Sequence, residues 1–279
     1  MTEGTGSDRS LDSPAATIDD RRPPLAVGAA VVFIACLVPP VSTYARRYEF
    51  VEALQFSLLA VAVPALAVAG SPWRRLGLAA GLPPDDTQVG APVGSLRWMD
   101  AVARGRRRHP ELVRSFVFGA LFLGVVTLWR IPPSVNALVG HPWLVGVEAV
   151  SLLVVGVGLW LELIESPPLS PRLSRPNRVA LAAASMWAVW VLAYLVGLSH
   201  ASWYHAYSHQ PGRGLSLAAD QQLTTGALWL AFGCAFIPVI FSNLIRWLQS
   251  EEDPDVEMHQ LVRLERTRGR TWGGGQTSP

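Results

Sequence analysis

Three histidines lie close together in the sequence, at a spacing that could bind a metal ion. They are His200, His205 and His209, and a helical turn would place the last two on one face because they are four residues apart. Imidazole is a common ligand of copper and zinc. The aromatic residues of the same segment are Trp203, Tyr204 and Tyr207. These are also typical of a belt at the headgroup level of a membrane, where histidine is merely tolerated, so the segment predicts either a metal site or an interfacial loop.

Five polar residues stand within or beside long apolar runs, where burying a polar group is costly. They are Glu52, Gln55, Arg130, Glu148 and Asp220. Each is a functional candidate by default, but each also has a structural interpretation. Gln55 can bond a neighbouring helix, Asp220 can cap the helix that follows it, and Arg130 can reach the lipid headgroups. Glu148 needs a partner at its depth, and we expect Arg130 or an outer-loop residue to be that partner.

Six apolar runs are long enough to position these residues in a membrane. Half of the 279 residues are hydrophobic and 16% are charged, and the charges gather in the connectors. A bilayer core requires about 20 apolar residues per helix, whose backbone groups must bond internally. The sequence therefore predicts an all-α polytopic membrane helix bundle with about six transmembrane helices. The predicted helices are Leu25–Thr43, Phe50–Gly70, Leu112–Ile131, Leu138–Ile164, Val179–Ser199 and Leu223–Trp247.

The arginines predict which ends of these helices face the cytoplasm. All 23 basic residues are arginine. Nineteen of them lie in the two tails and in the second and fourth connectors, and the other four are Arg46, Arg47, Arg130 and Arg213. By the positive-inside rule, the arginine-rich segments and both termini are cytoplasmic. The five polar residues and the three histidines then gather at the outer ends of the helices.

The chain divides into one membrane domain and two cytoplasmic tails. Residues 1–23 lack apolar periodicity and predict a disordered tail, residues 24–248 form the transmembrane domain, and residues 249–279 form the C-terminal tail. The inner loop, residues 71–111, carries apolar residues at helical spacing and predicts a short helix lying on an anionic leaflet. Its basic run favours the lipid bilayer as partner and argues against nucleic acid.

Several short sequence motifs lie in or beside the predicted helices, and their order along the chain is characteristic. They are Pro39-Pro40, Pro64, Gly70-Ser71-Pro72, His109-Pro110, Trp129-x-x-Pro132, His141-Pro142 with Glu148, and Asp220-Gln221-Gln222. Together they make the chain resemble, from about Pro39 to Trp247, the CtaG family of bacterial cytochrome c oxidase assembly factors. The resemblance implies a multi-pass protein of the bacterial plasma membrane that helps deliver copper to the catalytic subunit of the oxidase. It also implies a chaperone rather than an enzyme, with oxidase subunits as partners.

The chain departs from this family where its members usually carry intramembrane histidines. The corresponding positions here are Glu52 and Phe56 in the second helix, Arg130 in the third, and Val145 and Ala149 in the fourth. Cu(I) prefers thiolate, thioether or imidazole ligands, and this set offers none. Arg130 is a permanent cation. We therefore predict that an ionic cluster of Glu52, Glu148 and Arg130 replaces the metal site and ties three helices together.

Several functions are compatible with these residues. The leading hypothesis is an oxidase biogenesis scaffold or copper-delivery chaperone with reduced or lost metal binding. A second hypothesis keeps copper as the ligand, captured at the outer surface by His200, His205 and His209. A third is a small-solute or ion transporter whose path is lined by Glu52, Glu148 and Arg130. Catalysis is the least favoured, because nothing gives the serines and histidines of the loops a nucleophile geometry.

Overall fold

The described part of the chain is helical, which confirms the all-α prediction. The computed structural model describes residues 23–74, 111–166, 169, 171, 173–198, 203–208, 210 and 214–251. Within these ranges, β pairing is limited to an isolated bridge between Ser166 and Leu169. The predicted tails, most of the inner loop with its interfacial helix, and also His200 and His209, lie outside the described residues.

Among the described residues, five apolar segments are long enough to cross a membrane, and the protein is accordingly a multi-pass membrane protein. The first segment, Glu49–Ala69, joins α3 (Glu49–Ser57), the π-helical turn η1 (Leu58–Ala62) and α4 (Val63–Ala69). The others lie in α6 (Glu111–Arg130), α8 (Leu144–Leu163), α9 (Arg175–Leu198) and α11 (Leu217–Glu251). A sixth apolar helix, α1 (Pro23–Leu37), has 15 residues and is shorter than a full span. The count of six spans and the cytoplasmic placement of both termini therefore stay predictions.

Prolines divide two of the apolar runs that the sequence assigns to membrane helices. The first run ends at Leu37, and the short helix α2 (Val41–Ala45) follows Pro39-Pro40. The fourth run divides at Pro142 into α7 (Pro132–Gly140) and α8. Proline lacks a backbone N–H, and its ring clashes with the preceding turn of a helix. The prediction of one unbroken helix over Leu138–Ile164 is therefore wrong, whereas the first run is interrupted at the Pro39-Pro40 pair, where its sequence already indicates a break.

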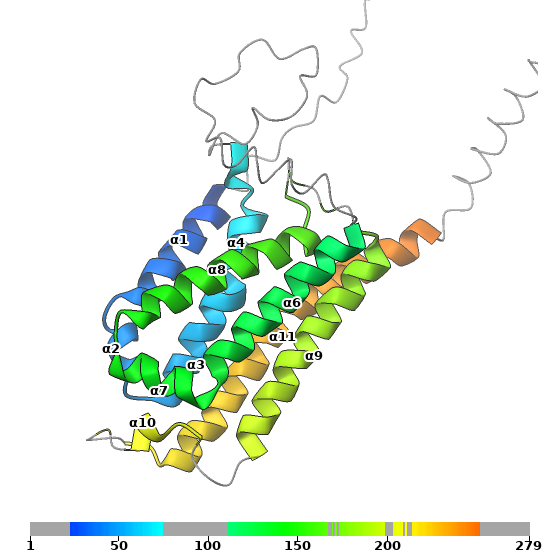
Figure 1. Cartoon of the computed structure of the whole chain (residues 1–279). Coiled ribbons are helices and arrows are strands. Elements are labelled where there is room, and N and C mark those ends of the chain that lie inside the picture. The colour runs from blue at the N-terminus through cyan, green and yellow to red at the C-terminus, as the bar shows by residue number, and fades with distance from the viewer. Residues whose placement is uncertain are drawn as a thin grey trace, which may run out of the picture.

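The helices form one bundle whose two ends differ (Figure 1). α9 packs along α11, α6 along α8 and α1 along α4, while α11 also contacts α3. The short helices α2, α7 and α10 (His205–Ser208) lie together at one end, which we name the outer end after its predicted orientation. The N-terminal turns of α1, α6 and α9 lie at the opposite, inner end. The centre is aromatic: Trp160 stacks on Phe236 with 5.1 Å between ring centroids.

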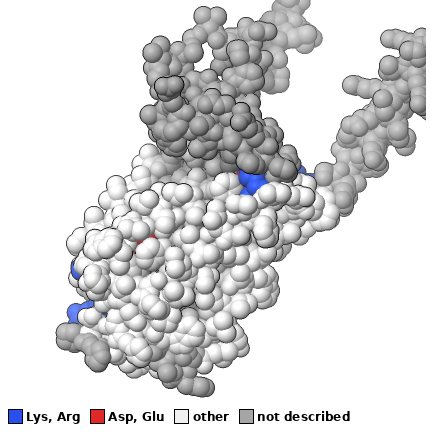
Figure 2. All heavy atoms as spheres, in the orientation of Figure 1, with Lys and Arg blue, Asp and Glu red and all other residues white. Residues whose placement is uncertain are grey.

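The outward faces of the long helices are apolar. Figure 2 shows one side of the molecule on which charged atoms are scarce along the length of the bundle. Large side chains such as Phe116 and Leu230 are 75% and 70% exposed, although they belong to no core. In water such a surface would be unfavourable, whereas against lipid tails it costs nothing. This surface is the structural counterpart of the hydropathy of the sequence.

A close backbone contact holds α8 against the segment Glu49–Ala69. Pro64 cannot donate a helical hydrogen bond, and the helix before it widens into the π turn η1. Gly156 of α8 lies against this turn. A Cβ atom added to Gly156 would stand 2.6 Å from Pro64 Cγ and 2.9 Å from the carbonyl oxygen of Ala60. Glycine is therefore required here for close helix packing rather than for backbone freedom.

We predict that Gly156→Ala destabilises the bundle by about 1–3 kcal/mol, because the added methyl group overlaps backbone atoms that cannot move alone. The control is Gly146→Ala on the same helix, where an added Cβ meets nothing within 4 Å. That substitution should leave stability unchanged or slightly raised, since alanine favours helix. The free energy of unfolding is measured by denaturant titration in detergent. Equal effects of the two substitutions would contradict the packing argument.

Candidate functional site

A buried ion pair joins α6 to α3 at the outer end of the bundle. Arg130 is the last residue of α6, and its Nη1 donates a hydrogen bond to Glu52 Oε2 of α3 at 2.5 Å. Arg130 is 1% exposed and Glu52 is 4% exposed. Isolated charges in such surroundings would be very costly, so each residue stabilises the charged form of the other. The structure thus brings together two of the residues that the sequence singles out.

Aromatic rings enclose the guanidinium group of Arg130. Its Cζ lies 5.1 Å from the ring centroid of Phe56 and 5.4 Å from that of Tyr204. The hydroxyl of Tyr204 donates a hydrogen bond to the backbone carbonyl of Arg130 at 2.9 Å. Both rings favour the cation through their electron-rich faces. Phe56 therefore contacts Arg130 at a position where the family resemblance leads us to expect a histidine.

The segment with the histidines folds onto this ion pair. Tyr204 and Tyr207 are fully buried, and the hydroxyl of Tyr207 donates to the carbonyl of Ala45 at 3.0 Å. Burial raises the pKa of both phenols above the ordinary value, so they remain neutral hydrogen-bond donors. These two tyrosines therefore contact protein rather than lipid, and their placement in an aromatic belt at headgroup level stays a prediction. They anchor the outer loop between the helices.

Glu148 lies near this ion pair without joining it. The residue is in α8 and is 3% exposed, and it interacts electrostatically with both Glu52 and Arg130. Its Oε1 has no hydrogen-bond partner within the described residues, and the same holds for Oε1 of Glu49. The expected direct pairing of Glu148 with Arg130 is not observed in that part of the chain. The outer end therefore contains more buried carboxyl groups than its one described ion pair uses.

Asp220 caps a helix other than its own. Its two carboxylate oxygens accept hydrogen bonds from the backbone N–H groups of Glu49 and Phe50, each at 3.0 Å. These are the first two residues of α3, whose flanking residue Tyr48 supplies no side-chain cap. The prediction that Asp220 caps α11 is wrong: α11 begins at Leu217, and Ser216 accepts the N–H of Ala219 at 3.2 Å. Asp220 instead holds α11 and α3 together.

The remaining polar candidate, Gln55, bonds a neighbouring helix as the sequence indicates. Its side-chain amide donates to the backbone carbonyl of Cys36 in α1 at 2.7 Å. This carbonyl belongs to the last turn of α1, where the helix leaves its final carbonyls without backbone partners. Gln55 thus joins α3 to the shorter helix α1.

A second buried ion pair at the inner end was not predicted from the sequence. Arg114 of α6 donates to both oxygens of Glu162 at 2.9 Å and 2.8 Å, and Ser115 donates to the same carboxylate at 3.0 Å. Glu162 lies in the last turn of α8 and is 0% exposed, so its charge is balanced inside the bundle rather than by water. The available signal was the antiparallel order of α6 and α8, which brings the start of one beside the end of the other.

The predicted histidine site is described at one of its three positions. His205 begins α10 and is exposed, whereas His200 and His209 lie outside the described residues. Within the ranges that the structure covers, no group of three His, Cys, Asp or Glu residues is arranged to hold a metal ion. The three-histidine site therefore stays a prediction.

An all-helical bundle with five membrane-spanning segments and buried ion pairs defines the class of protein: a multi-pass helical membrane protein. Residues 18–250 match the family described as cytochrome c oxidase caa3 assembly factor (Caa3_CtaG), and the chain belongs to that family. This confirms the resemblance drawn from the motifs. Neither the curated proteins nor the solved structures contain a match to the chain.

We predict that Arg130→Ala lowers the free energy of unfolding by about 3–5 kcal/mol, because it leaves the buried Glu52 carboxylate without its counter-charge. The matched control is Arg46→Ala, which removes an exposed arginine at the same end of the bundle and should change little. Thermal and denaturant unfolding in detergent measure both. An unchanged melting temperature for Arg130→Ala would show that the ion pair does not hold α6 to α3.

We also predict that Asp220→Ala costs about 1–2 kcal/mol by removing the cap of α3, although Asp220 lies on α11. Hydrogen exchange of backbone amides should increase at residues 49 and 50, whose N–H groups Asp220 accepts. Ser216→Ala is the comparison, and it should instead raise exchange at the start of α11. Faster exchange in α11 rather than α3 for Asp220→Ala would contradict the cross-helix cap.

Proposed function

We propose that the protein acts in cytochrome c oxidase biogenesis as a membrane scaffold in which an ion pair occupies the place of an intramembrane metal. Family membership supports the process, since the matching family is one of oxidase assembly factors. One observation carries the scaffold role: Arg130 is buried against Glu52 and Phe56. All three stand at positions where the resemblance leads us to expect histidine.

The chemistry of this group favours a fixed structure over metal transfer. Guanidinium is always protonated and supplies donors but no lone pair, so it repels a metal cation and cannot ligate one. Glu52 is already engaged, and neither Phe56 nor the buried Ala149 has a ligand atom for Cu(I). The residues at the outer ends therefore suit holding helices in register, with the outer loop anchored by Tyr204, for recognition by an oxidase subunit.

Copper delivery by this chain would then depend on the outer-loop histidines. His205 is exposed on α10, next to the buried Tyr204 that contacts Arg130. In that version of the proposal the ion pair positions the loop, and the loop histidines carry the metal as cargo. Copper content of the purified protein distinguishes the two versions.

The test is complementation of cells that lack the gene. We expect Glu52→Gln and Arg130→Gln to lower oxidase activity per membrane protein several-fold, because the outer loop loses its anchor, while His205→Ala retains activity. Immunoblotting for the variant proteins separates loss of function from loss of protein. Copper is quantified by elemental mass spectrometry after purification. Loss of activity and of bound copper in His205→Ala, with full activity in Glu52→Gln, would replace the scaffold with a copper carrier.

The transporter hypothesis draws support from one feature, the partnerless Oε1 of the buried Glu148. Unpaired carboxyl groups in membrane helices often mark proton or ion paths. A substrate-dependent proton current in reconstituted vesicles, abolished by Glu148→Gln but unaffected in the exposed-site variant Arg46→Gln, would favour transport over a scaffold role. An oxidase defect in Glu148→Gln without any current would favour assembly.

A further inference from the structure

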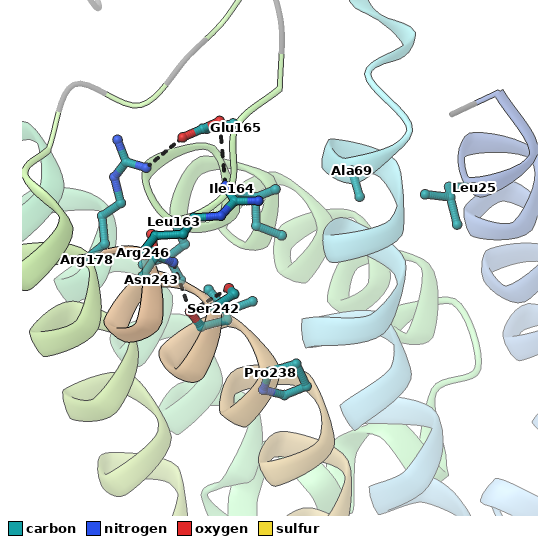
Figure 3. A pocket seen from close by; sticks show the side chains of 11 residues that line it. Leu25, Ala69, Leu163, Ile164, Glu165, Arg178, Pro238, Ser242, Asn243 and Arg246 are labelled. Carbon is teal, nitrogen blue, oxygen red and sulfur yellow. Dashed lines mark hydrogen bonds and ion pairs between the residues drawn. The ribbon is translucent and has the colours of Figure 1, made fainter. Parts of the chain in front are cut away.

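A cavity at the inner end of the bundle has a polar wall and an apolar wall. It holds about 610 Å³ and lies among residues of α1, α4, α8, α9 and α11. Figure 3 shows Leu25 and Ala69 on one side of the space and Pro238 on the other, with the charged residues gathered at one end. None of the outer-end residues described above lines it. The cavity is therefore separate from the Arg130 site.

The polar wall carries a net positive charge. Arg178 Nη1 lies 3.5 Å from Glu165 Oε1, and Arg246 Nη1 lies 3.9 Å from Glu165 Oε2. One carboxylate is thus shared between two guanidinium groups, and both contacts are longer than a good charge-assisted hydrogen bond. The arrangement leaves one positive charge uncompensated among these three residues.

The two arginines differ in how firmly they are held. Arg178 is largely buried, and it donates from Nε to the carbonyl of Leu173 at 2.8 Å and from Nη2 to that of Pro171 at 3.1 Å. The side chain of Arg246 is 60% exposed, and its ion pair at 3.9 Å is loose. Arg175, one turn before Arg178, has a buried Nη1 without a partner within the described residues. A fixed cation, a movable cation and spare donors thus lie at the same end of the bundle.

We propose that this cavity binds an anionic phospholipid, with its phosphate between Arg178 and Arg246 and an acyl chain along the apolar wall. The negative phosphodiester matches the uncompensated positive charge of the polar wall. The apolar wall, formed by residues such as Leu25, Ala69 and Leu163, matches a hydrocarbon chain. Basic pockets between membrane helices bind anionic headgroups in this way. A free phosphate would use the arginines but leave the apolar wall empty.

The position of the cavity agrees with this occupant. It lies at the end of the bundle that the arginine distribution predicts to be cytoplasmic, where anionic lipids attract basic residues. The long stem of Arg246 can pack along apolar surface while its guanidinium reaches the headgroup level. Ser242 and Asn243 stand on the same turn of α11 and add hydroxyl and amide groups to the polar wall.

The test measures thermal unfolding of the purified full-length protein in detergent with added lipid. Phosphatidylglycerol should raise the melting temperature more than phosphatidylcholine does, since a ligand of the folded state stabilises it. Arg246→Gln should lose about half or more of that difference, because one of the two phosphate ligands is gone. The matched control is Arg46→Gln, an exposed arginine at the outer end with the same change of charge, and it should respond as the wild type does.

A substitution that should strengthen lipid binding, rather than weaken it, completes the test. Glu165→Gln removes the competing carboxylate, so the shift caused by phosphatidylglycerol, relative to its own lipid-free protein, should grow. Mass spectrometry of lipids retained through purification should show phosphatidylglycerol enriched in the wild type and depleted in Arg246→Gln. Equal shifts with both lipids, an unchanged shift in Arg246→Gln, or an equal shift with soluble glycerol phosphate would each overturn the proposal.

Discussion

The ion pair between Arg130 and Glu52 is the constraint around which the outer half of the bundle is arranged. A charge at that burial is tolerated when its counter-charge lies beside it, so α6 and α3 must remain in the register that brings the two together. The inner end of α6 obeys the same rule through Arg114 and Glu162 of α8. α6 is thus fixed at both ends by charges on two different partners, while its outward face is free to contact lipid.

The position of the outer loop depends on the ion pair between Arg130 and Glu52. The hydroxyl of Tyr204 donates to the backbone carbonyl of Arg130, and the Tyr204 ring lies over the guanidinium group. The hydroxyl of Tyr207 donates to the carbonyl of Ala45, the last residue of α2. Residues 203–208 of the histidine-containing segment are therefore held against the bundle through these two tyrosines. The exposed His205 follows Tyr204 directly in the sequence, so its position at the outer end depends on the buried Arg130–Glu52 ion pair that Tyr204 contacts. In the proposed scaffold, this coupling would connect the buried ion pair to the surface that an oxidase subunit recognises.

The sequence was sufficient to single out several of the buried polar residues at the outer end, because a polar residue within an apolar run stands out whatever the packing of the helix. Glu52, Arg130 and Gln55 were predictable on that ground, as were the apolar helices. Partner choice was not, since it depends on which helix ends meet in space. Asp220 therefore caps α3 instead of α11, and Glu162 is buried rather than solvated. Pro142 was visible as well, but whether a proline bends or ends a helix depends on packing that one sequence does not display.

In the proposed replacement of a metal site by Arg130, the positive charge would be kept while what it can do would change. The guanidinium group of Arg130 pairs directly with Glu52 and attracts the nearby Glu148 electrostatically, and a metal ion would likewise supply positive charge near both buried carboxyl groups. A metal ion, however, can enter and leave, whereas a guanidinium group is bonded covalently to α6. Its donors are directed in a plane and require partners at fixed angles. A site built this way stabilises one arrangement of helices permanently. Under the scaffold proposal, such a site would contribute to oxidase assembly through the shape of the outer end rather than through exchange of an ion within the membrane.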